Sequence, residues 1–69
     1  MLLTMAKHGE ENYIKKITGK DEVRKFLGSL GFVEGEKVKV VSEMGGNVIL
    51  NIKNTRVALD KSMANRIYI

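Results

Sequence analysis

Residues 21–35 read DEVRKFLGSLGFVEG, and this stretch sets how the rest of the chain has to fold. Its apolar residues recur at i, i+3, i+4 and i+7, the spacing of one helical face: Val23, Phe26, Leu27 and Leu30. The spacing predicts an amphipathic α-helix over about residues 20–30, with its charged side chains on the other faces. The remaining elements are then expected to pack against this apolar face.

The sequence also predicts where this helix ends. Gly31 can adopt the left-handed conformation that closes a helix C-terminus, and Phe32 then packs back on Leu27 in a Schellman-type ending. The next four residues, 33–36, fit a type II turn with Gly35 at the position that requires positive φ. The chain is therefore expected to leave the helix through a tight turn and enter a strand.

Three short strands are predicted to follow this turn. Apolar and polar residues alternate over residues 37–42, 48–53 and 56–60, so each segment presents one apolar face. The pair Gly45-Gly46 supplies the first connection between them, and Asn54, which tolerates positive φ, supplies the second. We therefore expect an antiparallel meander.

The segments before the helix are less regular. Residues 1–4 fit a short edge strand. Residues 12–18 fit a strand with a bulge or a sharp bend, because Ile14 and Ile17 lie three positions apart where strict alternation requires two or four.

Two capping signals mark the starts of helical segments. Residues 18–21, TGKD, match the capping box [ST]-x-x-[DE], although Asp21 itself could equally be the cap. Asp60 is expected to cap a short helical turn near residues 61–65, after which residues 67–69 form a last short strand.

Five or six short antiparallel strands with one inserted α-helix are too few for a sandwich. They predict a mainly β fold, a small and strongly bent barrel. No internal repeat and no proline-containing linker divides the chain, so residues 1–69 are expected to form a single domain. At this length folding buries only about 60% of the surface of the unfolded chain, and the core is small.

The composition narrows the class of protein. The chain has no cysteine, so disulfides and thiolate metal clusters are excluded, and a reducing compartment is expected. No signal-peptide core or membrane-spanning apolar run is present, so we expect a cytoplasmic protein with no direct membrane insertion. The net charge of +4 allows contact with nucleic acid, acidic lipid or an acidic partner and selects none of them.

Catalytic and metal chemistry find no support in the sequence. His8 is the only histidine, and no cysteine pairs with it, so no nucleophile and base set is available and a non-enzymatic protein is expected. Imidazole and carboxylate suit divalent metals, but His8 with Glu10 and Glu11 fits a solvated loop better. We therefore predict no metal, cofactor or catalytic site. Residues 45–46 lack the context of a phosphate-binding loop.

Six basic residues lie within the strand-rich half of the chain and could contact phosphates: Lys37, Lys39, Lys53, Arg56, Lys61 and Arg66. Because basic and apolar positions merely alternate there, an ordinary solvated outer face is the favoured interpretation. No nucleic-acid partner is expected, and a nucleic-acid-binding small barrel remains the alternative. Three apolar residues lie next to turns or on the polar side of the alternation: Val33, Met44 and Ile49. Exposed together they would form a surface for binding another protein, whereas for each residue alone packing under a loop or simple exposure is the favoured interpretation.

An ordered set of residues resembles a known family over nearly the whole chain. The set comprises Leu3-Thr4, Lys7, Gly9-Glu10, Ile14, Ile17, Gly19, Leu27, Leu30-Gly31-Phe32, Gly35, Val38, Val40, Gly45-Gly46, Val57-Ala58-Leu59, Ala64 and Ile67. It is similar to the ferrous iron transport protein A (FeoA) family. The resemblance implies an SH3-like barrel, a fold that also forms the C-terminal domain of iron-dependent repressors. A stand-alone relative of that repressor domain is therefore a second alternative.

The resemblance implies an accessory role in ferrous iron uptake, by protein–protein binding to the cytosolic part of a FeoB-like membrane permease. As a hypothesis, the contact uses the helix end and its turn together with the neighbouring residue 44–46 hairpin. The candidate contact residues are Leu30, Phe32, Val33, Glu34, Met44 and Ile49. The sequence departs from the family pattern at His8, Glu34 and Asn47, where proline is frequent, and at Asp60, where arginine often stands.

Overall fold

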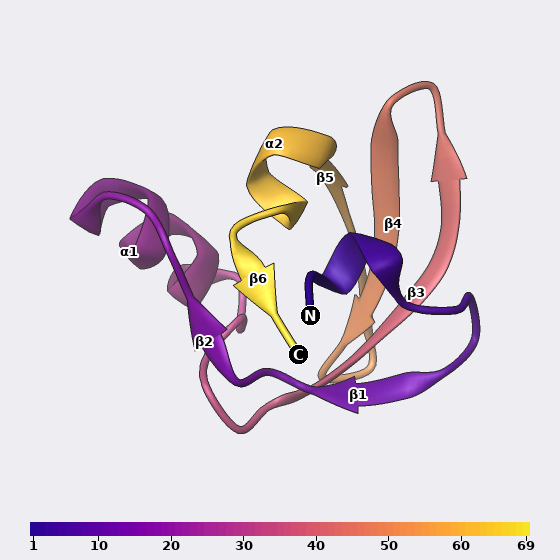
Figure 1. The fold of residues 1–69 in the computed structure, drawn as a ribbon, viewed down its shortest axis with the longest axis horizontal. Coiled ribbons are helices and arrows are strands. Elements are labelled where there is room, and N and C mark those ends of the chain that lie inside the picture. The colour runs from indigo at the N-terminus through magenta and orange to yellow at the C-terminus, as the bar shows by residue number, and fades with distance from the viewer.

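The predicted meander is present in the computed structural model, which describes residues 1–69 (Figure 1). Its strands are β3 (Lys37–Met44), β4 (Asn47–Ile52) and β5 (Thr55–Asp60), each antiparallel to the next. Their inward residues are buried: Val38, Val40, Val48, Leu50, Ile52 and Leu59. The alternation of apolar and polar residues therefore predicted the buried face of all three strands correctly.

Residues with positive φ make both connections in the meander. Gly45 and Gly46 have φ of 54° and 86°. The second turn uses Lys53 and Asn54, with φ of 49° and 61°. Two consecutive residues of positive φ match the right-handed twist of the flanking strands, as in type I′ hairpins. The sequence predicted the role of Asn54; the positive φ of Lys53 was not predicted.

The segment expected to be one bent strand forms two strands in different sheets. β1 (Glu11–Tyr13) pairs with β3, and β2 (Lys16–Ile17) pairs with β6 (Ile67–Tyr68). The fold thus has a four-stranded sheet in the order β1-β3-β4-β5 and a two-stranded sheet, β2-β6. The predicted bend lies at residues 14–15, where the Ile14 N–H donates to the Glu36 carbonyl at 2.9 Å.

The helix α1 (Asp21–Ser29) ends as predicted. Gly31 has a φ of 103°, and the Phe32 N–H donates to the Leu27 carbonyl at 3.0 Å. The Gly31 N–H donates to the Gly28 carbonyl at the same distance, which completes a Schellman motif. The type II turn follows, with Gly35 at a φ of 85°.

Phe26 is an exception to the predicted helix face. It is 49% exposed, whereas Leu27 is fully buried and Val23 and Leu30 are half-buried against the core. Adjacent helical residues are about 100° apart around the axis, so with Leu27 directed inward Phe26 lies at the margin of the stripe. The prediction that all four residues are buried was therefore wrong for Phe26.

Two predictions for the N-terminal third were also wrong. Residues 1–4 form no strand; the 3-10 helix η1 (Leu3–Met5) places Leu3 fully inside the core, and only Leu2 bridges to a strand residue, Tyr68. Lys20 is the N-cap of α1, without a side-chain hydrogen bond. The Thr18 hydroxyl instead donates to a carbonyl of the chain end, at Arg66, so a tertiary contact replaces the predicted cap.

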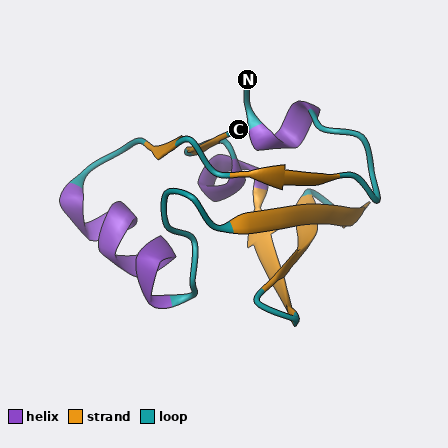
Figure 2. Cartoon of the chain, turned by 90° about the horizontal axis from the view of Figure 1, so that it is seen from below, coloured by secondary structure: helices purple, strands orange, loops and turns teal.

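The short helix α2 (Lys61–Ala64) begins with the predicted cap, because the Met63 N–H donates to Asp60 Oδ1 at 2.9 Å. Helices η1 and α2 pack against each other, and α1 lies to one side of the strands (Figure 2). The core consists of fourteen buried residues, all apolar, and no polar side chain is buried. Neither α-helix has the length and apolar character needed to span a membrane.

Candidate functional site

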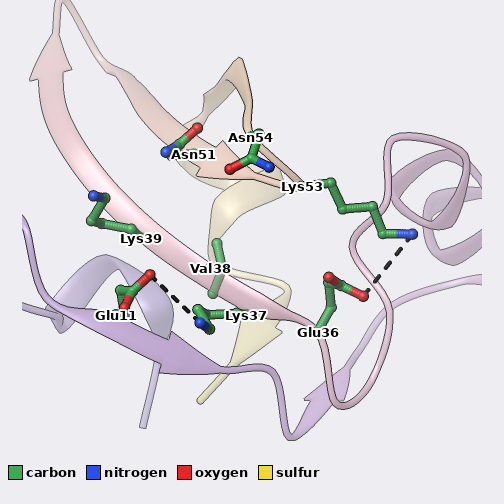
Figure 3. Close-up of a pocket in the computed structure, with 8 residues that line it drawn as sticks. All are labelled: Glu11, Glu36, Lys37, Val38, Lys39, Asn51, Lys53 and Asn54. Carbon is green, nitrogen blue, oxygen red and sulfur yellow. Dashed lines mark ion pairs between the residues drawn. The ribbon is translucent and has the colours of Figure 1, made fainter.

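A shallow polar depression of about 220 Å³ lies on the outer face of the four-stranded sheet (Figure 3). Its strand side chains Lys37, Lys39 and Asn51 point outward because their neighbours along β3 and β4 are buried, and one of those buried neighbours, Val38, contributes to the floor. The cross-strand register sets Glu11 and Asn51 on either side of Lys39 in one row. The lining residues are Glu11, Glu36, Lys37, Val38, Lys39, Asn51, Lys53 and Asn54.

Two ion pairs cross this depression. Lys37 Nζ lies 3.9 Å from Glu11 Oε2, and Lys53 Nζ lies 4.0 Å from Glu36 Oε2. Both lysine side chains are more than half exposed, so each pair contributes no more than about 1 kcal/mol. Lys39 forms no ion pair and carries the unbalanced positive charge of the depression.

This arrangement offers hydrogen-bond donors and acceptors to another surface and supplies no nucleophile with an adjacent base. No group of three or more His, Cys, Asp and Glu side chains is placed to hold a metal ion. His8 lies in an exposed turn. The donor chemistry present therefore does not fit a resident metal centre.

The predicted contact residues differ widely in exposure. Phe32 is only 1% exposed, so it is a core residue, and its assignment to a contact surface was wrong. It is buried because the Schellman motif turns it back beneath the helix. Leu30 and Ile49 are half-buried, whereas Val33 is 41% exposed, Met44 is 68% exposed and Glu34 is also exposed.

These residues do not form one surface. Met44 is at the tip of the β3–β4 hairpin, which lies far from the C-terminal end of α1 in both views (Figures 1 and 2). The hairpin next to the helix end is β4–β5: a Cβ on Gly31 would lie 3.5 Å from Lys53 Cδ and 3.9 Å from Ile52 Cγ1. The expectation that the residue 44–46 hairpin neighbours the helix end was therefore wrong.

Two exposed apolar side chains, Phe26 and Val33, instead lie at the C-terminal end of α1 and in the turn after it, with the half-buried Leu30 between them in the sequence. Phe26 and Leu30 are four residues apart, hence on one side of the helix, and Val33 follows in the turn beside Glu34. We call Phe26, Leu30, Val33 and Glu34 the α1-end patch. Sequence reasoning missed Phe26, although its position at the margin of the apolar stripe was a usable signal.

Comparison with known proteins identifies the family. The profile of the FeoA domain matches residues 1–69. The chain belongs to the FeoA family. A curated FeoA relative, assigned as Fe(2+) transport protein A of Methanocaldococcus jannaschii, is 34% identical over 67 residues, which cover 97% of this chain and 82% of that protein.

Solved structures of FeoA proteins share the fold. The zinc complex of Stenotrophomonas maltophilia FeoA, described as a prokaryotic SH3 domain protein, has a TM-score of 0.85 and 27% identity and covers 99% of this chain and 87% of that one. Iron(II) transport protein A of Clostridium thermocellum has a TM-score of 0.90 and 28% identity, covering 99% of this chain and 43% of that one. The predicted SH3-like barrel is confirmed.

The fold is also shared with a transcriptional regulator. A manganese-dependent transcriptional repressor has a TM-score of 0.88 with 18% identity, and this chain spans 40% of its length. At that identity the likeness concerns the fold alone, and one part of the repressor only.

Proposed function

We propose that this protein is a non-enzymatic accessory factor of ferrous iron uptake that binds the cytosolic part of a FeoB-type permease. The observation that carries the proposal is the match of the FeoA domain over the full chain, together with a curated relative assigned to Fe(2+) transport. Transport chemistry then belongs to the permease. This protein acts at the cytoplasmic face by occupying a surface of its partner.

The α1-end patch is the contact surface in this proposal. Phe26 combines a large aromatic side chain with 49% exposure, and aromatic residues dominate the binding energy of many protein interfaces. Val33 adds a second exposed apolar side chain, and Glu34 supplies a charge at the rim. A contact of this kind, an apolar centre with a polar rim, is typical of protein–protein interfaces.

The test is a calorimetric titration against the purified cytosolic part of the permease from the same source. We expect saturable binding, weakened about tenfold or more in Phe26→Ala because truncation of an aromatic anchor costs about 2 kcal/mol. Met44→Ala is the matched control, since Met44 is equally apolar, 68% exposed and at the other end of the molecule.

Two results would count against the proposal at different levels. Absence of binding by the parent protein at high micromolar concentration would overturn the permease partner. Unchanged binding by Phe26→Ala, with weakened binding by Met44→Ala, would keep the partner and move the contact to the β3–β4 hairpin. Circular dichroism melts of both variants would exclude unfolding as the cause.

A further inference from the structure

The outer edge of β5 is the longest strand edge without a partner in this fold. In the four-stranded sheet β5 has a neighbour, β4, on one side only. The edge at β1 comprises three residues, whereas β5 has six. Unpaired backbone N–H and C=O groups along such an edge can accept another strand.

The hydrogen-bond pattern shows which backbone groups are free. The Lys61 N–H, directly after β5, donates to the Gly46 carbonyl next to β4 at 3.2 Å. Because alternate residues of a strand direct their N–H and C=O groups to the same side, the residues that face away from β4 are Arg56, Ala58 and Asp60. No hydrogen bond from another part of the chain reaches the backbone of Arg56 or Ala58.

The side chains along this edge are accessible and self-complementary. Arg56, Ala58 and Asp60 are all exposed. If a second β5 runs antiparallel with Ala58 opposite Ala58, each Arg56 faces Asp60 of the other copy. Opposite charges at directly opposed positions stabilise a strand pair, and like charges destabilise it.

We propose that two copies of this chain pair along β5 in a two-fold antiparallel arrangement centred on Ala58. This register pairs every outward residue between Arg56 and Asp60, and it ends where α2 begins at Lys61. A shift by two residues would leave one charged residue opposite Ala58 and shorten the contact. The dimer then contains one continuous sheet with four strands from each copy. Its interface uses the same edge of both copies, so no third copy can add to it.

The proposal is independent of permease binding and goes beyond it. The contact area is small, since only five residues of each copy pair, from Arg56 to Asp60. Interfaces well below about 1,200 Å² are weak. We therefore expect reversible dimers that accumulate at high micromolar protein concentration.

Sedimentation equilibrium over a concentration series tests the charge register. Arg56→Glu sets a carboxylate opposite Asp60 of the other copy at both ends of the contact, so we expect dimerisation to weaken about tenfold or more. Asp60→Lys creates the reverse repulsion. Mixing these two variants relieves both repulsions by pairing opposite charges, so a heterodimer is expected where neither variant alone dimerises.

Cross-linking provides a second test that does not depend on the Asp60 cap. The chain has no cysteine, so Ala58→Cys introduces a single thiol at the proposed two-fold axis. Opposed residues of a hydrogen-bonded antiparallel pair have Cα atoms about 5.5 Å apart, a separation that a disulfide can bridge. Under mild oxidation Ala58→Cys is expected to form a covalent dimer much faster than the control Ser29→Cys on α1.

Support requires both the rescue on mixing and the faster cross-linking at position 58. A protein that remains monomeric at millimolar concentration, with equal cross-linking rates for the two cysteine variants, would overturn the proposal. So would a dimer that persists unchanged in Ala58→Pro. Proline removes the outward N–H at this edge position and costs no bond to β4.

Discussion

Single residues have large effects in this protein because its core is small. Leu27 is the only fully buried residue of α1, and Gly31 ends that helix with a φ of 103°. A domain of this size has only about 3–5 kcal/mol of stability from one hydrophobic core. The loss of one anchoring residue is therefore comparable to the total stability.

Leu27→Ala should lower the free energy of unfolding by about 2–5 kcal/mol, because it removes a fully buried side chain and leaves a cavity. Urea denaturation followed by circular dichroism measures the change. The neighbouring substitution Phe26→Ala is the control, and its cost should be well below that of Leu27→Ala because Phe26 is half exposed. Equal losses for the two variants would show that the helix packs on a different face.

Gly31→Val should lower the free energy of unfolding by about 1–3 kcal/mol through backbone strain at positive φ. A Cβ at this position has room, since it meets Lys53 Cδ at 3.5 Å, an ordinary contact, so the φ of 103° is the source of the strain. Gly28→Ala, three residues earlier in α1, should instead stabilise by about 0.4–1 kcal/mol. Thermal melts compare the two, and the same sign for both substitutions would contradict the proposed helix ending.

Local interactions, such as helix caps, determine where each element starts or ends. For α2 that device is Asp60, which accepts hydrogen bonds from the Ser62 hydroxyl at 2.7 Å and from the Met63 N–H at 2.9 Å. These bonds favour the charged carboxylate and hold its pKa below the ordinary value of 3.8, with the Ser62 bond the larger cause. A helix of only four residues has no other side-chain cap.

The Asp60 cap should therefore weaken in acid. A pKa lowered in the folded state means that the stabilisation is present above the ordinary pKa of 3.8 and is lost as the pH falls through the lower folded value. An NMR titration of the Met63 and Ser62 signals should show one transition below pH 3.8. Asp60→Asn retains a capping oxygen, so its signals should not titrate in that range; a transition in this variant would contradict the assignment.

At the scale of the whole molecule, no polar or charged side chain is buried in the core. The interior contains fourteen apolar residues. The net charge of the chain is +4, and two of the lysines in the polar depression have glutamate partners. Of the three lysines that line the depression, only Lys39 is therefore left without a carboxylate partner to contact a phosphate.

We accordingly expect no retardation of a short DNA duplex or RNA in a mobility assay, even at low salt. Phosphate-driven binding would appear there and fall steeply as the salt concentration rises from about 50 to 200 mM. Retardation with that salt dependence would favour the nucleic-acid-binding alternative. Lys39→Ala would then locate the contact, because Lys39 is the lysine of the depression without an ion pair.

Local sequence signals predicted much of the fold and little of the candidate site. Gly31, Gly35 and Asp60 could be assigned because positive φ and helix capping are requirements of a few neighbouring residues. The same local reasoning indicated that Phe32 packs back on Leu27, and the position of Phe26 at the margin of the helix stripe was a further, unused signal. The extent of exposure, 49% for Phe26 and 1% for Phe32, was decided by packing against the sheets.

Local preferences along the chain were sufficient for the meander, the helix and its ending, and the short capped helix, since each follows from periodicity or backbone preference within about ten residues. Long-range packing was needed to divide residues 11–17 between two sheets, to bring the α1 end to the β4–β5 turn, and to leave one edge of β5 unpaired. Those outcomes depend on which distant segments exclude water from the same core. A local sequence pattern cannot predict which distant segments pack together, because that depends on the free energy of the whole folded chain.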